Sequence, residues 1–116
     1  MPRIARAVAV GFAHHITHRG NNRQDIFFVD DDRRTYLDIL KEHCDKYALD
    51  ILAYCLMTNH IHIVAIPNKD DSLAKGIGRA HLRYTQYINR FHKRSGHLWE
   101  GRFYLCALDE QTFRNR

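Results

Sequence analysis

The sequence contains little cysteine and no long hydrophobic run. Its three cysteines, Cys44, Cys55 and Cys106, are odd in number and lack CxxC spacing, which argues against a disulfide framework and against a cysteine zinc knuckle. No apolar run approaches the roughly 18 residues that cross a bilayer, so no membrane partner is predicted. The segment 1–6 lacks the apolar region of a signal peptide, and the cytoplasm is therefore the expected location.

Internal repeats, low-complexity stretches and linkers rich in Pro, Gly or Ser are also missing. The chain has 116 residues, of which 45% are hydrophobic and 27% charged. This composition is typical of a globular protein and argues against disorder. The length suits one modest core, so residues 1–116 are predicted to form a single domain.

Acidic residues are absent from one long segment. The chain carries 18 Lys and Arg against 13 Asp and Glu, yet none of the acidic residues lies between Asp71 and Glu100. The cations inside that segment are Lys75, Arg79, Arg83, Arg90, Lys93 and Arg94. Such segregation favours a polyanionic partner, of which nucleic acid is the leading candidate. The alternative is a solvated helix face.

Hydrophobic periodicity and turn residues predict six elements. In order they are a strand at 7–18, a helix at 30–47, strands at 50–57 and 60–67, a helix from 72 to about 94, and a strand at 98–108. The order β-α-β-β-α-β predicts an α+β domain of the ferredoxin-like split type. Both helices then pack on one face of an antiparallel sheet, and the other face stays open.

The second predicted helix has two different faces. At 100° per residue one face is apolar and packs on the sheet; its residues are Leu73, Ile77, Ala80, Tyr84, Ile88 and Phe91. The cations named above lie roughly opposite and form a stripe along the helix. Tyr84 is predicted to be a core residue, whereas Tyr87, at the boundary, suits either packing or stacking on a base.

His60 and His62 form the sharpest local pattern. In a strand, alternation places both histidines on one face and Ile61, Ile63 and Ala65 on the other. The isoleucines suit the helix-covered face, so the two rings are predicted to be exposed on the open face. Two imidazoles one pleat apart can chelate a cation, but they can equally be simple surface residues. His14 and His18 also share a strand face, with His15 opposite.

Four segments in order resemble the HUH single-tyrosine transposases, in particular the REP-associated tyrosine transposases of the insertion-sequence-200-like group. The resemblance covers roughly residues 8 to 113. The segments are His15-Ile16-Thr17-His18-Arg19-Gly20-Asn21-Asn22-Arg23, Met57-Thr58-Asn59-His60-Ile61-His62-Ile63-Val64, Tyr84-Thr85-Gln86-Tyr87-Ile88-Asn89 and Gly96-His97-Leu98-Trp99-Glu100-Gly101-Arg102-Phe103.

The resemblance implies a DNA transposition and recombination function. Such endonucleases cut single-stranded DNA near hairpins through a tyrosine that forms a 5′-phosphotyrosine link. It implies that His60 and His62 bind a divalent metal, Mg²⁺ or Mn²⁺, which polarises the scissile phosphate. The predicted DNA-binding residues are Arg19, Arg23, Lys75, Arg79, Arg83, Arg90, Arg94 and Arg102.

The chain departs from the family pattern at its end. In the family the nucleophilic tyrosine lies on a helix after the last strand, yet no tyrosine follows Tyr104 and the sequence stops at Arg116. The domain is therefore expected to lack that tyrosine helix, and no catalytic residue is assigned. Open alternatives are a DNA-hairpin-binding module that does not cleave and a metal-binding interaction domain. A missing helix would leave apolar open-face surface uncovered, which leaves room for a homodimer.

Overall fold

The computed structural model describes residues 8–108, which form one antiparallel sheet and two long helices. The strands are β1 (His14–Arg19), β2 (Leu49–Leu56), β3 (His60–Pro67) and β4 (Tyr104–Ala107). The helices are α1 (Asp30–Lys46) and α2 (Ser72–Phe91), with a short 3-10 turn, η1 (Asn21–Arg23), after β1. The predicted order β-α-β-β-α-β is confirmed.

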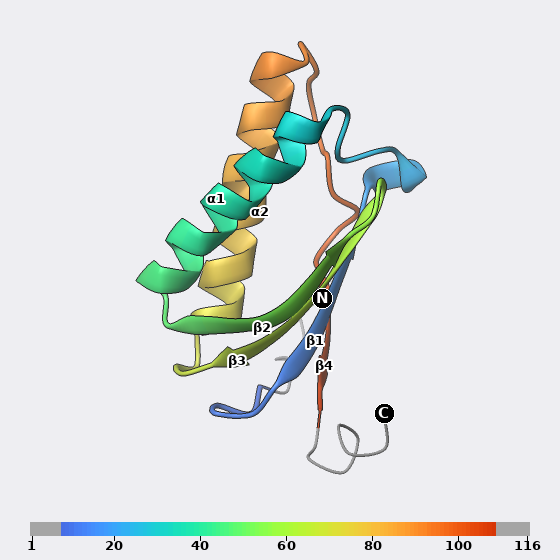
Figure 1. Ribbon diagram of the computed structural model, residues 1–116. Coiled ribbons are helices and arrows are strands. Elements are labelled where there is room, and N and C mark those ends of the chain that lie inside the picture. The colour runs from blue at the N-terminus through green and yellow to red at the C-terminus, as the bar shows by residue number, and fades with distance from the viewer. Residues whose placement is uncertain (1–7, 109–116) are drawn as a thin grey trace.

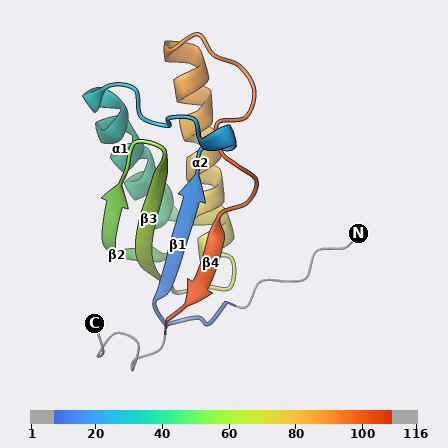
Figure 2. The ribbon, with the colours of Figure 1, turned by 90° about the vertical axis from the view of Figure 1, so that its right-hand side faces the viewer.

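The sheet has the strand order β2-β3-β1-β4, and every neighbouring pair is antiparallel. Both helices lie on one side of it (Figure 1), and a quarter turn brings the uncovered face toward the viewer (Figure 2). The α+β architecture with one open sheet face is therefore confirmed. Below, the covered face is the side of the sheet toward the helices, and the open face is the other side.

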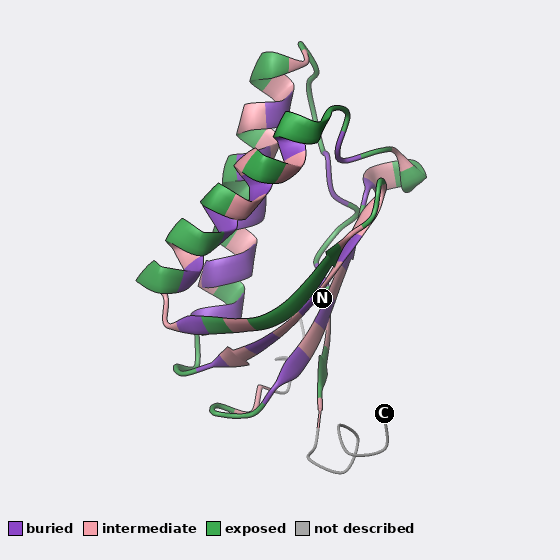
Figure 3. Cartoon of the chain, in the orientation of Figure 1, coloured by how far each residue is buried: buried purple, intermediate pink, exposed green. Residues whose placement is uncertain are grey.

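The core lies between the sheet and the helices, where the buried residues gather (Figure 3). Ile16 of β1 and Ile61 and Ile63 of β3 are fully buried there against Ile77 and Ile88 of α2. Burying each of these side chains contributes about 1.5–3 kcal/mol. Alternation within β1 and β3 therefore holds both strands in register with the core.

Tyr84 is buried in this core and its hydroxyl donates to the Ile26 carbonyl oxygen at 2.7 Å. The prediction that Tyr84 is a core residue is thus confirmed. Phe91 is the exception on the same predicted apolar face, because 68% of its surface is exposed. It lies in the last turn of α2, which extends past the end of the sheet (Figure 1), so nothing in the sheet covers it.

Three predicted boundaries were wrong. The first strand begins at His14, because a turn precedes it in which Phe12 N–H bonds to the Ala9 carbonyl; the predicted residue 7 lies outside the described residues. Helix α2 ends at Phe91, and Lys93 beyond it has a positive φ of 52°. The last strand is short, since Leu98 and Trp99 before it are buried in the core and not part of β4.

A β-bulge in β2 changes which face its later residues occupy. Ile51 pairs with Ala65, but Ala53 pairs with Val64, so one extra residue is accommodated between them. As a result Cys55 lies opposite His62 on the open face. Simple alternation from Ile51 would have placed Cys55 on the covered face.

Among residues 8–108, no helix has the length and hydropathy needed to cross a bilayer.

Candidate functional site

The open face carries the predicted histidine pair near the end of the β2–β3 hairpin. The rings of His60 and His62 are 5.0 Å apart between centroids and nearly perpendicular, while Ile61 between them is fully buried on the covered face. The two rings are half-buried, not fully exposed as predicted. The hairpin turn is closed by a bond from Met57 N–H to the His60 carbonyl oxygen at 2.9 Å, which agrees with the predicted turn at 58–59.

Both histidines use Nδ1 for hydrogen bonds. His60 Nδ1 lies 2.8 Å from Asn59 Oδ1, an acceptor, so this nitrogen donates. His62 Nδ1 lies 3.0 Å from His15 Nε2 and 3.2 Å from Thr17 Oγ1. Because Nδ1 of each ring has a partner, Nε2 is the nitrogen that can bind a cation. Partners of this kind orient metal-binding histidines in known sites.

The pKa of His60 is lowered. Burial is the main cause, and the nearby His62 and the positive charge of Arg19 lower it further. Arg19 pairs with His60 across β1 and β3, so its guanidinium is the cation next to the histidine pair. A neutral imidazole is the form that binds metal, and a nearby arginine suits a phosphate.

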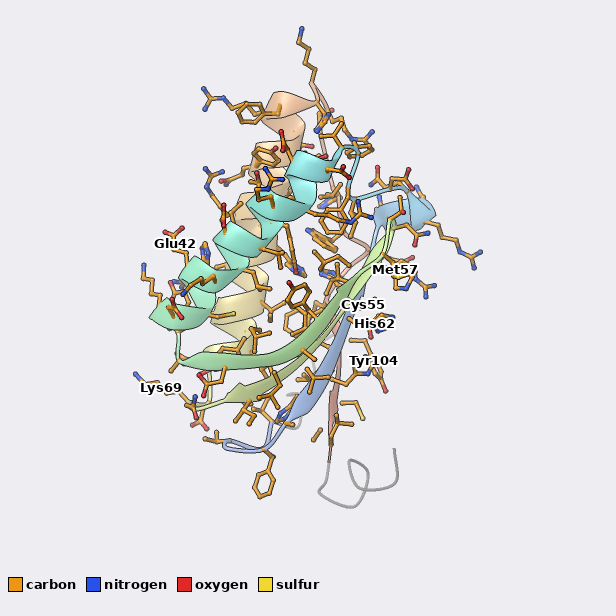
Figure 4. All side chains as sticks on the ribbon, viewed as in Figure 1. Glu42, Cys55, Met57, His62, Lys69 and Tyr104 are labelled. Carbon is orange, nitrogen blue, oxygen red and sulfur yellow. The ribbon has the colours of Figure 1, made fainter. Side chains whose placement is uncertain are left out.

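A row of open-face residues crosses all four strands at the level of His62. Cross-strand pairing places Cys55 of β2, His62 of β3, Thr17 of β1 and Tyr104 of β4 in this order. His62 and Tyr104 both lie on the side of the sheet away from the helices (Figure 4). The Tyr104 side chain is 64% exposed, so the open face presents an aromatic ring in the same row as His62.

Within residues 8–108, no group of three or more His, Cys, Asp and Glu side chains is arranged to hold a metal ion. His60 and His62 therefore offer two ligands, and other coordination positions would fall to water or to a bound phosphate. Two imidazole ligands suit such a weak, open site.

The histidines of β1 divide between the two faces. His14 and His18 are buried on the covered face, whereas His15 lies on the open face beside His62, with the two rings stacked 5.2 Å apart. The predicted division, with His14 and His18 on one face and His15 on the other, is confirmed, but no role was predicted for His15. Ile16 lies between His15 and Thr17 and is an apolar residue suited to the core. Because side chains alternate along a strand, its position is the sequence signal that identifies His15 and Thr17 as open-face residues.

The predicted DNA-binding residues fall into two groups. Arg19 and Arg23 lie at the end of β1 and in η1, and Arg94 reaches this region, where it bonds to Gln24 and lies over the Phe28 ring at 4.9 Å. Arg19, Arg23 and Arg94 thus lie around the segment 19–28, and the first of them adjoins the histidine pair.

The second group follows α2 on the helical side of the molecule. Arg79, Arg83 and Arg90 are exposed there, while Lys75 forms an ion pair with Asp71 at 2.9 Å. Arg79 also contacts the Tyr47 hydroxyl and packs over its ring. The sheet separates this stripe from His60 and His62, so the structure does not bring the two together. Arg102 lies exposed in the loop before β4, next to Gly101, whose carbonyl oxygen bonds to His18.

A family model described as transposase IS200 like matches residues 9–115. Over 86 residues the chain is 26% identical to a Haemophilus influenzae protein provisionally named a REP-associated tyrosine transposase, a match that covers 65% of this chain and 49% of the relative. The chain thus spans about half the length of that curated relative.

Two solved structures share the fold. The structure of a REP-associated tyrosine transposase bound to a REP hairpin has a TM-score of 0.77 at 16% identity, covering 99% of this chain and 67% of that one. A Deinococcus radiodurans protein provisionally described as a transposase has a TM-score of 0.67 at 18% identity, covering 98% and 92%. Since the family match runs from residue 9 to residue 115, the chain belongs to the family of IS200-like transposases.

Proposed function

We propose that this chain binds hairpin DNA with an adjoining single strand and holds a divalent cation on the open face of its sheet. The arrangement of His60 and His62 carries the proposal. Both rings share the open face, both use Nδ1 for hydrogen bonds, and Arg19 lies beside them. The structural relative bound to a REP hairpin supports DNA as the ligand class.

The proposed cation site consists of His60 and His62, each binding through Nε2. A bound Mg²⁺ or Mn²⁺ would polarise a scissile phosphate and stabilise charge on its oxygens. Arg19 would contact the same or a neighbouring phosphate, because it lies across from His60 in the β1–β3 pairing. The DNA strand at this site would therefore lie across the open face.

The proposed DNA contacts outside the open face are Arg23, Arg94 and the stripe along α2. These cations would bind phosphates without reading sequence. Because the sheet separates the α2 stripe from the histidine pair, one straight strand does not reach both. A hairpin stem along α2 would contact the stripe, and a single strand that passes round the end of the sheet at 19–28 would then reach the histidine pair.

The strand-cleaving step of the family requires a tyrosine nucleophile. Burial raises the pKa of both Tyr36 and Tyr84, which lie in the core on the covered face. Tyr87 donates to the buried Asp32 at 3.1 Å. We therefore infer that these three tyrosines are structural and do not supply the nucleophile.

The test compares two labelled DNA molecules by fluorescence anisotropy: a hairpin with a single-stranded extension and a blunt hairpin of the same stem. The extension should strengthen binding, and Mn²⁺ should strengthen it further only for the extended hairpin. Arg19→Ala should remove most of the advantage of the extension, whereas Lys41→Ala, on the outer surface of α1, should not. Equal affinity for both hairpins in wild type would contradict a single-strand site on the open face.

A further inference from the structure

Three side-chain atoms meet at one point on the open face. His15 Nε2 lies 3.0 Å from His62 Nδ1, Thr17 Oγ1 lies 3.2 Å from the same Nδ1, and Thr17 Oγ1 lies 3.4 Å from His15 Nε2. The His15 and His62 rings are stacked with an interplanar angle of 11°. The contact is diagonal across two strands, because His62 pairs directly with Thr17 and His15 pairs with Val64.

This contact determines which nitrogen of His62 has a lone pair. In a neutral imidazole one nitrogen donates and the other accepts. If His62 donates from Nδ1 to His15 Nε2, then His62 Nε2 keeps its lone pair and can bind a cation. If His15 donates instead, the His62 proton lies on Nε2, and that nitrogen cannot bind the cation.

We propose that His15 is a positioning residue that accepts the Nδ1 proton of His62 and so presents His62 Nε2 to the cation. The inference rests on the proposed cation site. It assigns the His15 proton to Nδ1 and gives the Thr17 hydroxyl a secondary part, because a hydroxyl donates or accepts according to its neighbours.

The two histidines of the pair are held in different ways. His60 has the side-chain amide oxygen of Asn59 as its partner, and that oxygen only accepts. His62 instead has another imidazole as its partner, and in a neutral imidazole either nitrogen can carry the proton. The tautomer of His62 is therefore the adjustable property of the site, and His15 is the residue that sets it.

His15 is a positioning residue and not a third ligand. Its Nε2 already faces His62 Nδ1 at hydrogen-bond distance, and the described residues contain no cluster of three metal-binding groups. Outer partners of this kind, when removed, cost about 10- to 100-fold in metal affinity. His15→Ala should weaken Mn²⁺ binding by that factor, whereas His15→Gln, whose carbonyl oxygen accepts, should recover part of the loss.

The first measurement is made without metal. Nitrogen-15 NMR of the imidazole rings reports the tautomer of His62, which should be mainly the Nδ1–H form in wild type and in His15→Gln. The Nδ1–H fraction should fall in His15→Ala. A wild-type His62 mainly in the Nε2–H form, or an unchanged tautomer in His15→Ala, overturns the inference.

The second measurement titrates Mn²⁺ into wild type, His15→Ala, His15→Gln and the control His97→Ala, and follows unbound Mn²⁺ by electron paramagnetic resonance. His97 is exposed in the loop after α2, so its removal controls for unspecific loss of a histidine. Equal Mn²⁺ affinity in wild type and His15→Ala overturns the role of His15 and leaves the proposed function standing. If wild type binds no Mn²⁺ at millimolar concentration, the proposed cation site fails and this inference with it.

Discussion

His18 and His81 face each other through their Nδ1 atoms at 2.6 Å, inside the core and on the opposite side of the sheet from His60 and His62. The Tyr36 hydroxyl lies 2.6 Å from His81 Nε2, and the Trp99 ring stacks on His81 with centroids 4.0 Å apart. These contacts connect β1, α1, α2 and the segment before β4. The buried histidines therefore belong to the packing of the domain, and the open-face histidines to its proposed site.

The stability of the domain should fall below about pH 6.5 because of His81. Burial lowers the pKa of His81 well below its usual value, and His18 adds to the effect. Below the unfolded pKa of about 6.5 the unfolded chain gains a proton that the folded chain does not bind, so the free energy of unfolding decreases by up to about 1.4 kcal/mol per pH unit. Urea unfolding at several pH values measures this dependence. The free energy of unfolding should change less with pH in His81→Phe than in wild type, and as much as in wild type in His97→Ala.

Asp32 should produce a separate acid transition at lower pH. Burial alone would raise its pKa, but hydrogen bonds from His92, from the Phe28 and Val29 N–H groups and from Tyr87 lower it. Because the pKa of Asp32 is lower in the folded chain, its ionised carboxylate stabilises the fold at pH values above the unfolded pKa of about 3.9. This contribution is lost as the pH falls below about 3.9 and through the lower pKa of the folded state.

Asp32→Ala should cost about 2–3 kcal/mol at pH 7, since it removes the first-turn acceptor of α1 and leaves buried donors without a partner. Asp32→Asn, which keeps an acceptor oxygen, should cost less. Chemical denaturation of the two variants measures the difference. Equal losses would show that the negative charge of the carboxylate, and not the presence of one acceptor oxygen, is what stabilises the fold.

The sequence predicted the order of elements because local pattern is strong in two segments. The alternation in 60–67 and the helical period in 73–88 both place their apolar residues toward one core, between the sheet and the helices. It failed where tertiary contacts override local pattern. The bulge in β2 reverses the face of Cys55, and Leu98 and Trp99 join the core although their segment resembles a strand.

The candidate site was predictable only where local pattern determines it. His60 and His62 lie within one alternating strand, so local pattern places them on one face. The role of His15 depends on the pairing of β1 with β3, which joins residues 47 positions apart, and no local pattern reveals that pairing. The division of the cations into two groups likewise depends on tertiary structure, because it follows from whether the element that bears each cation lies in the helical layer or in the sheet.

His60→Ala should abolish Mn²⁺ binding with little loss of stability. Two neutral imidazoles leave most coordination positions to water, so the loss of one ring removes half of the protein ligands. The His60 ring is half-buried and lies on the open face, so its removal leaves the core intact. Isothermal titration calorimetry with Mn²⁺ measures the loss, and thermal unfolding controls for the fold. Unchanged affinity would remove His60 from the site.

The α2 stripe should contribute to DNA affinity through phosphate charge alone. Neutralising one contact lowers the salt slope for single-stranded DNA by about 0.7, so Arg79→Ala combined with Arg83→Ala should lower it by about twice that amount if both contact phosphates. Lys41→Ala, an exposed residue of α1, should leave the slope unchanged. An unaltered slope in the double variant would make the stripe a solvated helix face.

The 116-residue chain should form no covalent adduct with DNA. Tyr36 and Tyr84 are in the core, Tyr47 packs with Arg79, and Tyr54 pairs with Ile63 in the edge strand β2. Tyr104 shares the open face with His62, but the β4 backbone holds it and limits its approach to a phosphorus atom in line. A denaturing gel after incubation of a labelled hairpin with Mn²⁺ should show no shifted band. A shifted band that Tyr104→Phe abolishes would identify Tyr104 as the nucleophile.

Strand β1 holds residues for both faces within six positions, with His14, Ile16 and His18 directed to the core and His15, Thr17 and Arg19 to the open face. An insertion of one residue within this strand, directly after His14, would exchange the two sets beyond that point. Histidine would replace isoleucine in the core at the same moment that the His62 partner disappeared from the surface. Mutations of this kind therefore cannot damage the proposed site and spare the fold, so natural variation in this strand should consist of substitutions and not of length changes.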